Sequence, residues 1–469
     1  MLSWSLNTVV AQLSRVDSFI QHEMQERKIP GLQLAIVQKL KITLLKSYGI
    51  ADLQHQVAVT DKTIFAINSC TKAITGVEIM QLVEEGKVDL EASVATYLND
   101  LPSSWQEVTL KQLLTHVSGI PNLLRVLNPV GGLAGVGNEE AVWSKTKTLP
   151  MDFKPGTRFS YNQTNYALLG KIIDKLGGKP FAQQFNERQF MFAGMPGTIF
   201  ADSRDVIPGM TTTYRYVTQQ DGQILPEEKL TTNYSEFANF RRTASGLNST
   251  AEDLSHWLIA LQNGTLFKSV SSLKTLWTPG TYLDGSPTQW ALGWVVKPRY
   301  THRAVIATGG GRSAFFVYPD DDLAIVVLTN LAGAFPEDFI DELAGFYHPE
   351  IPASDPVTAL RMQLRLRGYE QASVVYHELK KKDDRFSPLE VDLNDWAYRL
   401  MANKHLYEAL HIFKLNVELY PSSWNVYDSY GEVLLKSGLH DLGIEMYKKS
   451  IALNPDNLAA KKIVESVSK

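Results

Sequence analysis

The sequence predicts an α+β catalytic domain followed by an all-helical tail, and three observations predict it. Apolar segments of strand length occur near both ends of residues 1–350. Helical spacing of apolar residues dominates between them, and from about Pro352 onward only helical patterns occur. Strands that are far apart in the chain, with helices between them, indicate one shared sheet covered by helices, and the middle third is expected to form a helical subdomain.

The individual elements follow from the pattern in chain order. A helix is expected over about residues 9–25, and the apolar segments Leu32–Val37 and Ile42–Leu45 are typical of a β-hairpin. The late strands are expected at Ala291–Val296, Ala304–Ala307, Ala314–Val317 and Leu323–Leu328. The polar run Pro319–Asp322 has the composition of the turn between the last two strands.

The tail contains an internal repeat. At a spacing of about 34 residues, Ala397 aligns with Gly431, Ala409 with Gly443, Phe413 with Tyr447 and Pro421 with Pro455. This period is typical of tetratricopeptide helix hairpins, and Thr358–Lys380 would be a degenerate third pair. We therefore expect a hydrolase-like domain at 1–350, a helical linker or degenerate repeat at 351–384, and repeats at 385–469. The repeats either bind a protein or peptide partner or simply pack as an appendage.

Composition excludes several classes of function. The 46 basic and 50 acidic residues give a net charge of −4, so no nucleic-acid partner is expected. The single cysteine, Cys70, excludes an intrachain disulfide. The longest apolar run, Leu323–Leu328, is far shorter than a membrane span. No signal peptide is visible, which predicts a cytoplasmic protein, or a periplasmic one if a leader has been removed.

Ser69-Cys70-Thr71-Lys72 is one of four Ser-x-x-Lys sequences; the others are Ser144/Lys147, Ser271/Lys274 and Ser466/Lys469. Only the first follows an apolar stretch and opens a helical pattern, so Ser69 is expected at a helix start, where free N–H groups favour negative charge. A lysine three residues later lies on the same helix face and can activate the serine if its pKa is depressed. Taken alone, the motif would more often be a capping serine and a surface lysine.

Further segments occur in a specific order after this motif. They are Leu113–Gly119, Pro155–Tyr161 with the following Asn162-Gln163, Ser245–Thr250, and Ala307-Thr308-Gly309-Gly310. This order resembles the class C β-lactamases, DD-peptidases and related esterases, over roughly residues 10–345. The Gly-rich run is followed by a strand pattern instead of a helix, which argues against a phosphate-binding loop.

The resemblance implies roles for individual residues. Ser69 would be the acylated nucleophile and Lys72 its activating partner, while Tyr161 would act as general base with a pKa lowered by nearby lysine charge. The N–H groups of Ser69 and Gly310 would form the oxyanion hole, or Gly311 in place of Gly310 after a slip of one residue. The substrate-binding residues implied are Gln163, Thr308, Gly311 and Arg312.

Two positions depart from the pattern of that superfamily. Gln163 stands where an asparagine is usual, which lengthens the amide side chain but keeps its donor and acceptor. Ala307 stands where a lysine or histidine would bind a substrate carboxylate, and Arg312 is the nearby cation that could replace it. Without such a cation, ester or amide substrates lacking a carboxylate near the scissile bond are favoured over β-lactams.

The sequence therefore predicts a serine hydrolase that acts on a small-molecule or peptide acyl substrate through acyl-Ser69, without a metal or cofactor. An acyltransferase using the same acyl-enzyme is the first alternative. A catalytically idle binding protein that recruits partners through its repeats is the second, and Ala307 and Gln163 are the observations in its favour. Cys70 is expected to be buried packing, and His116 to brace a loop.

Overall fold

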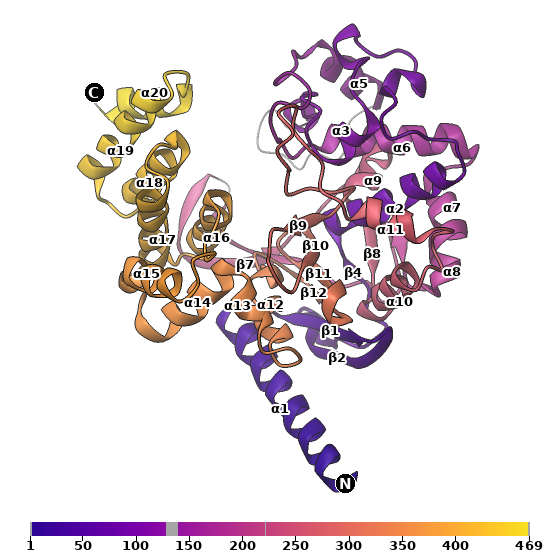
Figure 1. Ribbon diagram of the computed structural model, residues 1–469, viewed down its shortest axis with the longest axis horizontal. Coiled ribbons are helices and arrows are strands. Elements are labelled where there is room, and N and C mark those ends of the chain that lie inside the picture. The colour runs from indigo at the N-terminus through magenta and orange to yellow at the C-terminus, as the bar shows by residue number, and fades with distance from the viewer. Residues whose placement is uncertain (1, 128–138, 221, 468–469) are drawn as a thin grey trace. The chain divides into compact units, whose positions relative to one another are not determined.

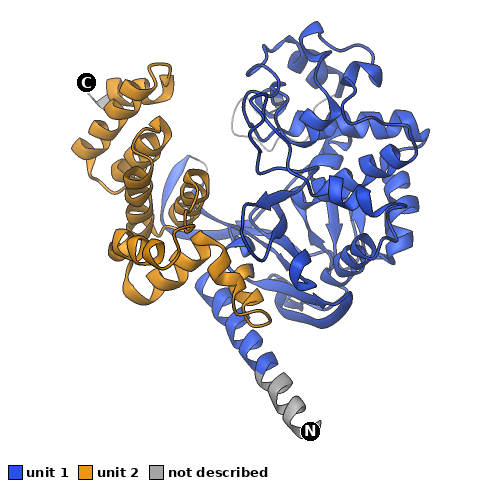
Figure 2. Cartoon of the chain, in the orientation of Figure 1, with its two compact units in different colours: residues 1–340 blue, residues 341–469 orange. Residues whose placement is uncertain are grey.

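The computed structural model describes residues 2–127, 139–220 and 222–467. The chain divides into two compact units, residues 1–340 and residues 341–469, which Figure 2 shows in blue and orange. The opening helix α1, Leu2–Glu26, covers the range expected from the sequence and begins earlier.

The first unit is built on a seven-stranded sheet with the order β3-β2-β1-β12-β11-β10-β9, in which every neighbouring pair is antiparallel. The strands are β1 Gly31–Gln38, β2 Lys41–Asp52, β3 Val57–Ala58, β9 Val295–Lys297, β10 Ala304–Gly309, β11 Ser313–Tyr318 and β12 Leu323–Thr329. The register aligns Leu32 with Thr329 and Gln38 with Leu323. The first and last thirds of the unit therefore share one sheet, and the α+β prediction is confirmed.

The central strands are apolar because both of their faces are covered. Every residue of β11 and β12 is buried, as is β1 except at its last residue. Helix α10, Ala251–Gln262, packs on β1 and β12, while α2, Thr71–Glu84, packs against α6, Gln163–Gly177, and α9, Arg242–Ser245. Trp257 of α10 stacks on Trp294 with 5.9 Å between ring centroids, and Phe315 of β11 meets both rings. This aromatic cluster joins the helical layer to the sheet.

The middle of the unit is mostly helical. Its further helices are α3 Leu110–Leu114, α4 Leu124–Leu127, α5 Glu139–Thr148, α7 Phe181–Phe185, α8 Met191–Ala193 and α11 Val270–Leu276. Figure 1 shows α3 and α5 gathered at the end of this unit away from β1 and β2. Two small sheets were not predicted: the strands β4 Phe65–Ala66, β8 Leu247–Ser249 and β5 Ile199–Phe200 form one, and β6 Tyr214–Gln220, β7 Gln223–Thr232 and β13 Leu331–Ala332 form the other.

Sequence analysis did not predict these strands because they lack the apolar pattern on which strand prediction depends. β7 is rich in polar residues and has no buried face, so it carries no apolar alternation. β4 and β5 are only two residues long, which is too short for a periodic pattern.

The predicted strand Ala291–Val296 is wrong over most of its length, because β9 begins only at Val295. A tight turn occupies the preceding residues: the N–H of Ala291 donates to the carbonyl of Trp294 at 2.8 Å, and Gly293 has a φ of +92°. The residues Ala291, Leu292 and Trp294 are apolar because they are buried in the core. An apolar run can mark a buried turn as well as a strand.

The second unit contains only helices in its described residues. Its boundary falls within α12, Ile340–Ala344, and the remaining helices are α13 Ile351–Ser354, α14 Pro356–Arg367, α15 Ala372–Lys382, α16 Glu390–Ala402, α17 Leu406–Leu419, α18 Trp424–Lys436, α19 His440–Leu453 and α20 Leu458–Val467. The start of α18 follows the start of α16 by the same interval as the start of α19 follows that of α17. This interval equals the repeat period read from the sequence, so the period is the spacing of consecutive helix pairs.

Small residues lie where the paired helices cross. A Cβ atom added to Gly431 would lie 3.1 Å from the carbonyl oxygen of Gly443, so α18 and α19 approach closely at this point. The aligned Ala397 and Ala409 of the preceding pair are fully buried. Within the described part of the chain, no helix has the length and apolarity needed to cross a membrane.

Candidate active site

The segment that carries Ser69 has an unusual backbone. It leaves β4 and enters a short 3₁₀ turn, Asn68–Cys70, which continues directly into α2. Asn68 has a φ of +46°, a left-handed conformation that asparagine tolerates better than most residues. This turn leaves Ser69 half-buried while the next residue, Cys70, is fully buried. Burial raises the pKa of the Cys70 thiol well above its usual value, so Cys70 is core packing, as the sequence predicted.

Lys72 lies one helical turn after Ser69 and is fully buried. Its Nζ atom is 3.4 Å from Ser69 Oγ, 3.1 Å from Gln163 Oε1 and 2.7 Å from the carbonyl oxygen of Ala244. Burial, and secondarily the positive charge of Arg241, lower the pKa of Lys72 well below its usual value. Burial therefore favours the neutral amine of Lys72 close to the serine hydroxyl, and this is the form that a proton acceptor requires.

Tyr161 and Gln163 reach the same point from the start of α6. Asn162 caps this helix, because its side chain accepts a hydrogen bond from the Thr164 N–H. The residues on either side of the cap are thereby fixed, with Gln163 against Lys72 and the Tyr161 ring centroid 4.7 Å from Lys72 Nζ. The longer amide of Gln163 thus reaches the lysine from the first turn of α6.

The expected lowering of the Tyr161 pKa is wrong. Burial of the phenol raises this pKa, and hydrogen bonds to Ser69 and Gln163 offset the rise only in part. The reason is that burial disfavours the charged phenolate, and it also disfavours the charged form of Lys72 that would stabilise a phenolate. These pKa directions favour a protonated phenol at Tyr161 and the free base at Lys72.

His116 braces the loop that precedes α6, as expected. Its carbonyl oxygen accepts the N–H of Ser160 at 2.9 Å, and its Nδ1 accepts the N–H of Asn162 at 3.1 Å. Burial lowers the pKa of His116 well below its usual value, so the ring stays neutral and can accept. The His116 ring also packs against Tyr161, with 4.6 Å between ring centroids.

An aromatic wall, consisting of Phe159, Tyr161 and Trp290, borders the site. Trp290 lies 5.5 Å from Tyr161 and stacks on Phe159 at 6.1 Å between ring centroids. Trp290 belongs to the loop between α11 and β9, and no motif in the sequence singled it out. Its place in the wall depends entirely on the tertiary fold.

The glycine run forms a tight turn between β10 and β11. Gly310 and Gly311 both have a φ of +60°, as at the two central residues of a type I′ turn, and the N–H of Arg312 donates to the Gly309 carbonyl at 3.0 Å. A Cβ added to Gly309 would lie 2.0 Å from the carbonyl oxygen of Ile67 and 3.0 Å from the amide nitrogen of Ser69. The end of β10 therefore packs directly on the serine segment, and the half-buried Thr308 precedes this contact.

Arg312 follows the glycine turn, and its buried side chain lines a cavity together with Asn68 and Asn248. The cation that acts on Lys72 is Arg241, which sequence analysis missed. Arg241 lies in the 3₁₀ turn Asn239–Arg241 just before α9, so its position just ahead of the Ser245–Thr250 segment was the available signal.

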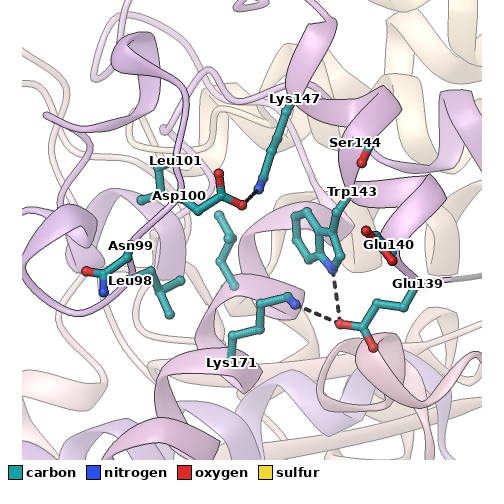
Figure 3. A pocket seen from close by; sticks show the side chains of 11 residues that line it. Leu98, Asn99, Asp100, Leu101, Glu139, Glu140, Trp143, Ser144, Lys147 and Lys171 are labelled. Carbon is teal, nitrogen blue, oxygen red and sulfur yellow. Dashed lines mark hydrogen bonds and ion pairs between the residues drawn. The ribbon is translucent and has the colours of Figure 1, made fainter.

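The other Ser-x-x-Lys copies lack these surroundings. Ser144 and Lys147 line a cavity of about 520 Å³ beside α5, where Lys147 pairs with the exposed Asp100 at 2.5 Å (Figure 3). Ser271 and Lys274 are exposed on α11. Of the last copy, Lys469 lies outside the described residues.

Comparison with known proteins gives matches over about 70% of the chain. Protein flp of Staphylococcus aureus strain MW2 is 26% identical over 345 residues, which cover 70% of this chain and 65% of that protein. The chain thus spans slightly less than two thirds of the length of this relative.

Solved structures show the same fold. The octameric penicillin-binding protein homologue from Pyrococcus abyssi matches with a TM-score of 0.59 and 24% identity over 72% of this chain and 77% of that one. EstCE1, a hydrolase with promiscuous acyltransferase activity, matches with a TM-score of 0.57 and 17% identity over 71% of this chain and 98% of that one. The family described as Beta-lactamase matches residues 16–347, well over half of the sequence, and the chain belongs to this family.

Proposed function

We propose that the protein is a serine hydrolase that cleaves an ester or amide through an acyl-Ser69 intermediate. The observation that carries the proposal is the buried Lys72, whose pKa is depressed and whose Nζ lies 3.4 Å from the half-buried Ser69 Oγ. A serine needs an adjacent base to become nucleophilic, and a neutral lysine amine at this distance is such a base.

The acylation step follows from the protonation states. The Lys72 amine takes the Ser69 hydroxyl proton as Oγ attacks the substrate carbonyl, and the N–H groups of Ser69 and Gly310 stabilise the oxyanion. The Tyr161 phenol then gives its proton to the leaving oxygen or nitrogen as the bond to the acyl carbon breaks, and the Lys72 ammonium returns a proton to Tyr161. A water molecule then attacks the acyl carbon, and the same proton transfers in reverse order release the acyl group from Ser69 Oγ.

The aromatic wall favours esters with an aryl or alkyl group beside the scissile bond. Ala307 offers a methyl group where a carboxylate-binding cation would be expected, while Phe159 and Trp290 offer apolar surface. Because EstCE1 shares the fold and is a hydrolase with promiscuous acyltransferase activity, an alcohol that replaces water as acceptor is the natural extension of the same chemistry.

We also propose that helices α16–α19 form two tetratricopeptide-like hairpins that bind a protein or peptide. One support is the regular spacing of equivalent helices, which matches the tetratricopeptide period of about 34 residues. The other is the close approach of α18 and α19 at Gly431. Residues of α14 and α15 share the hydrophobic core of these pairs, in keeping with a degenerate third pair.

Covalent labelling tests the hydrolase proposal. The purified chain is exposed in parallel to a fluorophosphonate, a p-nitrophenyl ester and a penicillin, and its intact mass is measured. We expect a fluorophosphonate adduct and ester turnover, and neither in Ser69→Ala. A folded protein that forms no adduct with any reagent would instead support the idle binding-protein alternative. Penicillin acylation that matches the ester rate would contradict the ester preference.

Arg241 provides a prediction about pH dependence. Lys72 accepts a proton only when neutral, so kcat/KM falls as the pH drops below the Lys72 pKa. Arg241→Gln removes a positive charge that lowers this pKa, so the pKa rises and the acidic limb of the profile moves to higher pH. Arg241→Lys keeps the positive charge, so the acidic limb of its pH profile should stay close to that of the wild type.

The measurement is kcat/KM for a p-nitrophenyl ester as a function of pH. Arg303→Gln is the control, because it removes one positive charge from a half-exposed arginine that pairs with Asp320. An acidic limb that stays in place in Arg241→Gln would show that Arg241 does not tune Lys72.

A further inference from the structure

A cavity of about 340 Å³ adjoins the serine segment. Its wall includes Asn68, Thr211, Tyr234, Asn248 and Arg312, together with Asp202. Asn68 immediately precedes the nucleophile, and a Cβ added to Gly310 would lie 2.9 Å from Asn68 Cγ. The cavity therefore borders the serine segment at Asn68 and the end of the glycine turn at Arg312.

Arg312 is the unusual feature of this wall. Its side chain is only 4% exposed, and within the described part of the chain its guanidinium has neither a hydrogen-bond partner nor an ion-pair partner. Burial alone lowers its pKa to about 10, so the group remains a cation at neutral pH. A buried charge without a partner is costly, and an anion seated against it would offset that cost.

The acidic residues of the cavity wall already form hydrogen bonds and ion pairs with other arginines. Asp202 accepts hydrogen bonds from Arg204 and Arg242, and Arg242 also pairs with Asp205 at 3.1 Å. These contacts, together with backbone N–H groups, hold the pKa of Asp202 well below its usual value. The two carboxylates therefore neutralise arginines other than Arg312.

Within the part of the chain that the structure describes, three oxygen atoms in the wall of the cavity are also buried without a hydrogen-bond partner. Thr211 Oγ1, Asn248 Oδ1 and Asn68 Oδ1 are buried and have no hydrogen-bond partner among the described residues. Thr211 and Asn248 are more than nine-tenths buried, and the Asn248 amide nitrogen is occupied by the carbonyl of Ala201 at 2.8 Å. The Thr211 hydroxyl can donate a hydrogen bond to an anion, while the two amide oxygens can accept hydrogen bonds from N–H or O–H groups.

We propose that this cavity binds a carboxylate-bearing portion of the substrate, with Arg312 holding the carboxylate and the amide oxygens of Asn68 and Asn248 accepting neighbouring N–H or O–H groups. The inference rests on the proposed hydrolase function and gives its substrate class: an anionic ester or amide. The cation absent at Ala307 is replaced by one placed in a different wall of the site.

The test uses pairs of aryl esters that differ only in a carboxylate or an isosteric carboxamide on an aromatic ring. In one pair, 4-nitrophenyl esters of 3-carboxyphenylacetic and 3-carbamoylphenylacetic acid, the group is on the acyl side. In the other, phenylacetate esters of 3-hydroxybenzoate and 3-hydroxybenzamide, it is on the alcohol side. The quantity compared is the ratio of kcat/KM for the carboxylate to kcat/KM for the carboxamide.

We expect the wild type to prefer the carboxylate in at least one pair, and that pair identifies the side of the substrate that enters the cavity. In Arg312→Gln the ratio should fall about tenfold or more, as loss of a charge-assisted hydrogen bond implies. Arg312→Lys should restore part of it, and the control Arg303→Gln should keep the wild-type ratio. A wild type without preference in either pair, or a ratio unchanged in Arg312→Gln, would overturn the inference.

A binding measurement separates this inference from the proposed function. Calorimetric titration of Ser69→Ala with 3-carboxyphenylacetate and with its carboxamide requires no turnover. Carboxylate-selective binding that is lost in the Ser69→Ala/Arg312→Gln double variant would support the anion site even if no ester were cleaved. Ester turnover without a carboxylate preference in either assay would leave the hydrolase proposal intact and remove the anion site.

Discussion

Alanine in place of Ser69 should lower kcat/KM for a p-nitrophenyl ester by about 10⁴-fold or more, because no other group in the site can carry the acyl intermediate. Cys70 is adjacent in sequence but fully buried, with its pKa raised, and it cannot replace the hydroxyl. The measurement is steady-state hydrolysis with the intact mass followed in parallel. Both kcat and the amount of covalent adduct should fall in this variant.

The chain contains matched controls for this variant. Ser144→Ala and Ser271→Ala remove the serines of two other Ser-x-x-Lys copies, which lie outside the site, and both variants should keep wild-type activity. Turnover that persists in Ser69→Ala, at a rate close to that of these controls, would mean that the measured hydrolysis does not pass through Ser69.

The second large effect is expected for Lys72→Met, which replaces the amine by an apolar side chain of similar length. Acylation should slow by about 10²–10⁴-fold, the usual contribution of a positioned base. A methionine fits a fully buried position, so the loss should not come from unfolding, and thermal unfolding checks this. The measurement is the single-turnover rate of acylation by a p-nitrophenyl ester.

Comparison with Tyr161→Phe separates base from acid. With Lys72 as base and the Tyr161 phenol as proton donor, Tyr161→Phe should slow esters with poor alkoxide leaving groups far more than the p-nitrophenyl ester, whose leaving group needs little protonation. Lys72→Met should slow both classes alike. Equal loss for both esters in Tyr161→Phe, with only a slight effect of Lys72→Met, would instead make Tyr161 the base. Lys274→Met, in the exposed copy on α11, is the control.

Several features of the molecule could be predicted because they depend on local spacing. The central strands β1, β11 and β12 are buried on both faces. Their sequences are therefore runs of apolar residues, and such runs predict strands. The regular helix spacing of the second unit follows from one repeated pattern of small and aromatic positions. The proximity of Ser69 to Lys72 follows from one turn of helix.

Other features depend on residues that are distant in the chain. The contact of Gln163 with Lys72 joins the start of α6 to α2, and Trp290 reaches the aromatic wall from the loop before β9. No spacing rule connects these segments, so sequence analysis could name Gln163 only through a family resemblance and did not find Trp290 at all.

By itself, the sequence determined the α+β sheet, the helical tail and the serine with its lysine, because each rests on periodicity or on neighbours within one turn. Only the tertiary structure decided the directions of the pKa shifts, downward for Lys72 and upward for Tyr161, and placed the unpaired Arg312 in a cavity beside Asn68. The physical reason is that a pKa depends on burial and on surrounding charges, which the fold brings together from distant parts of the chain.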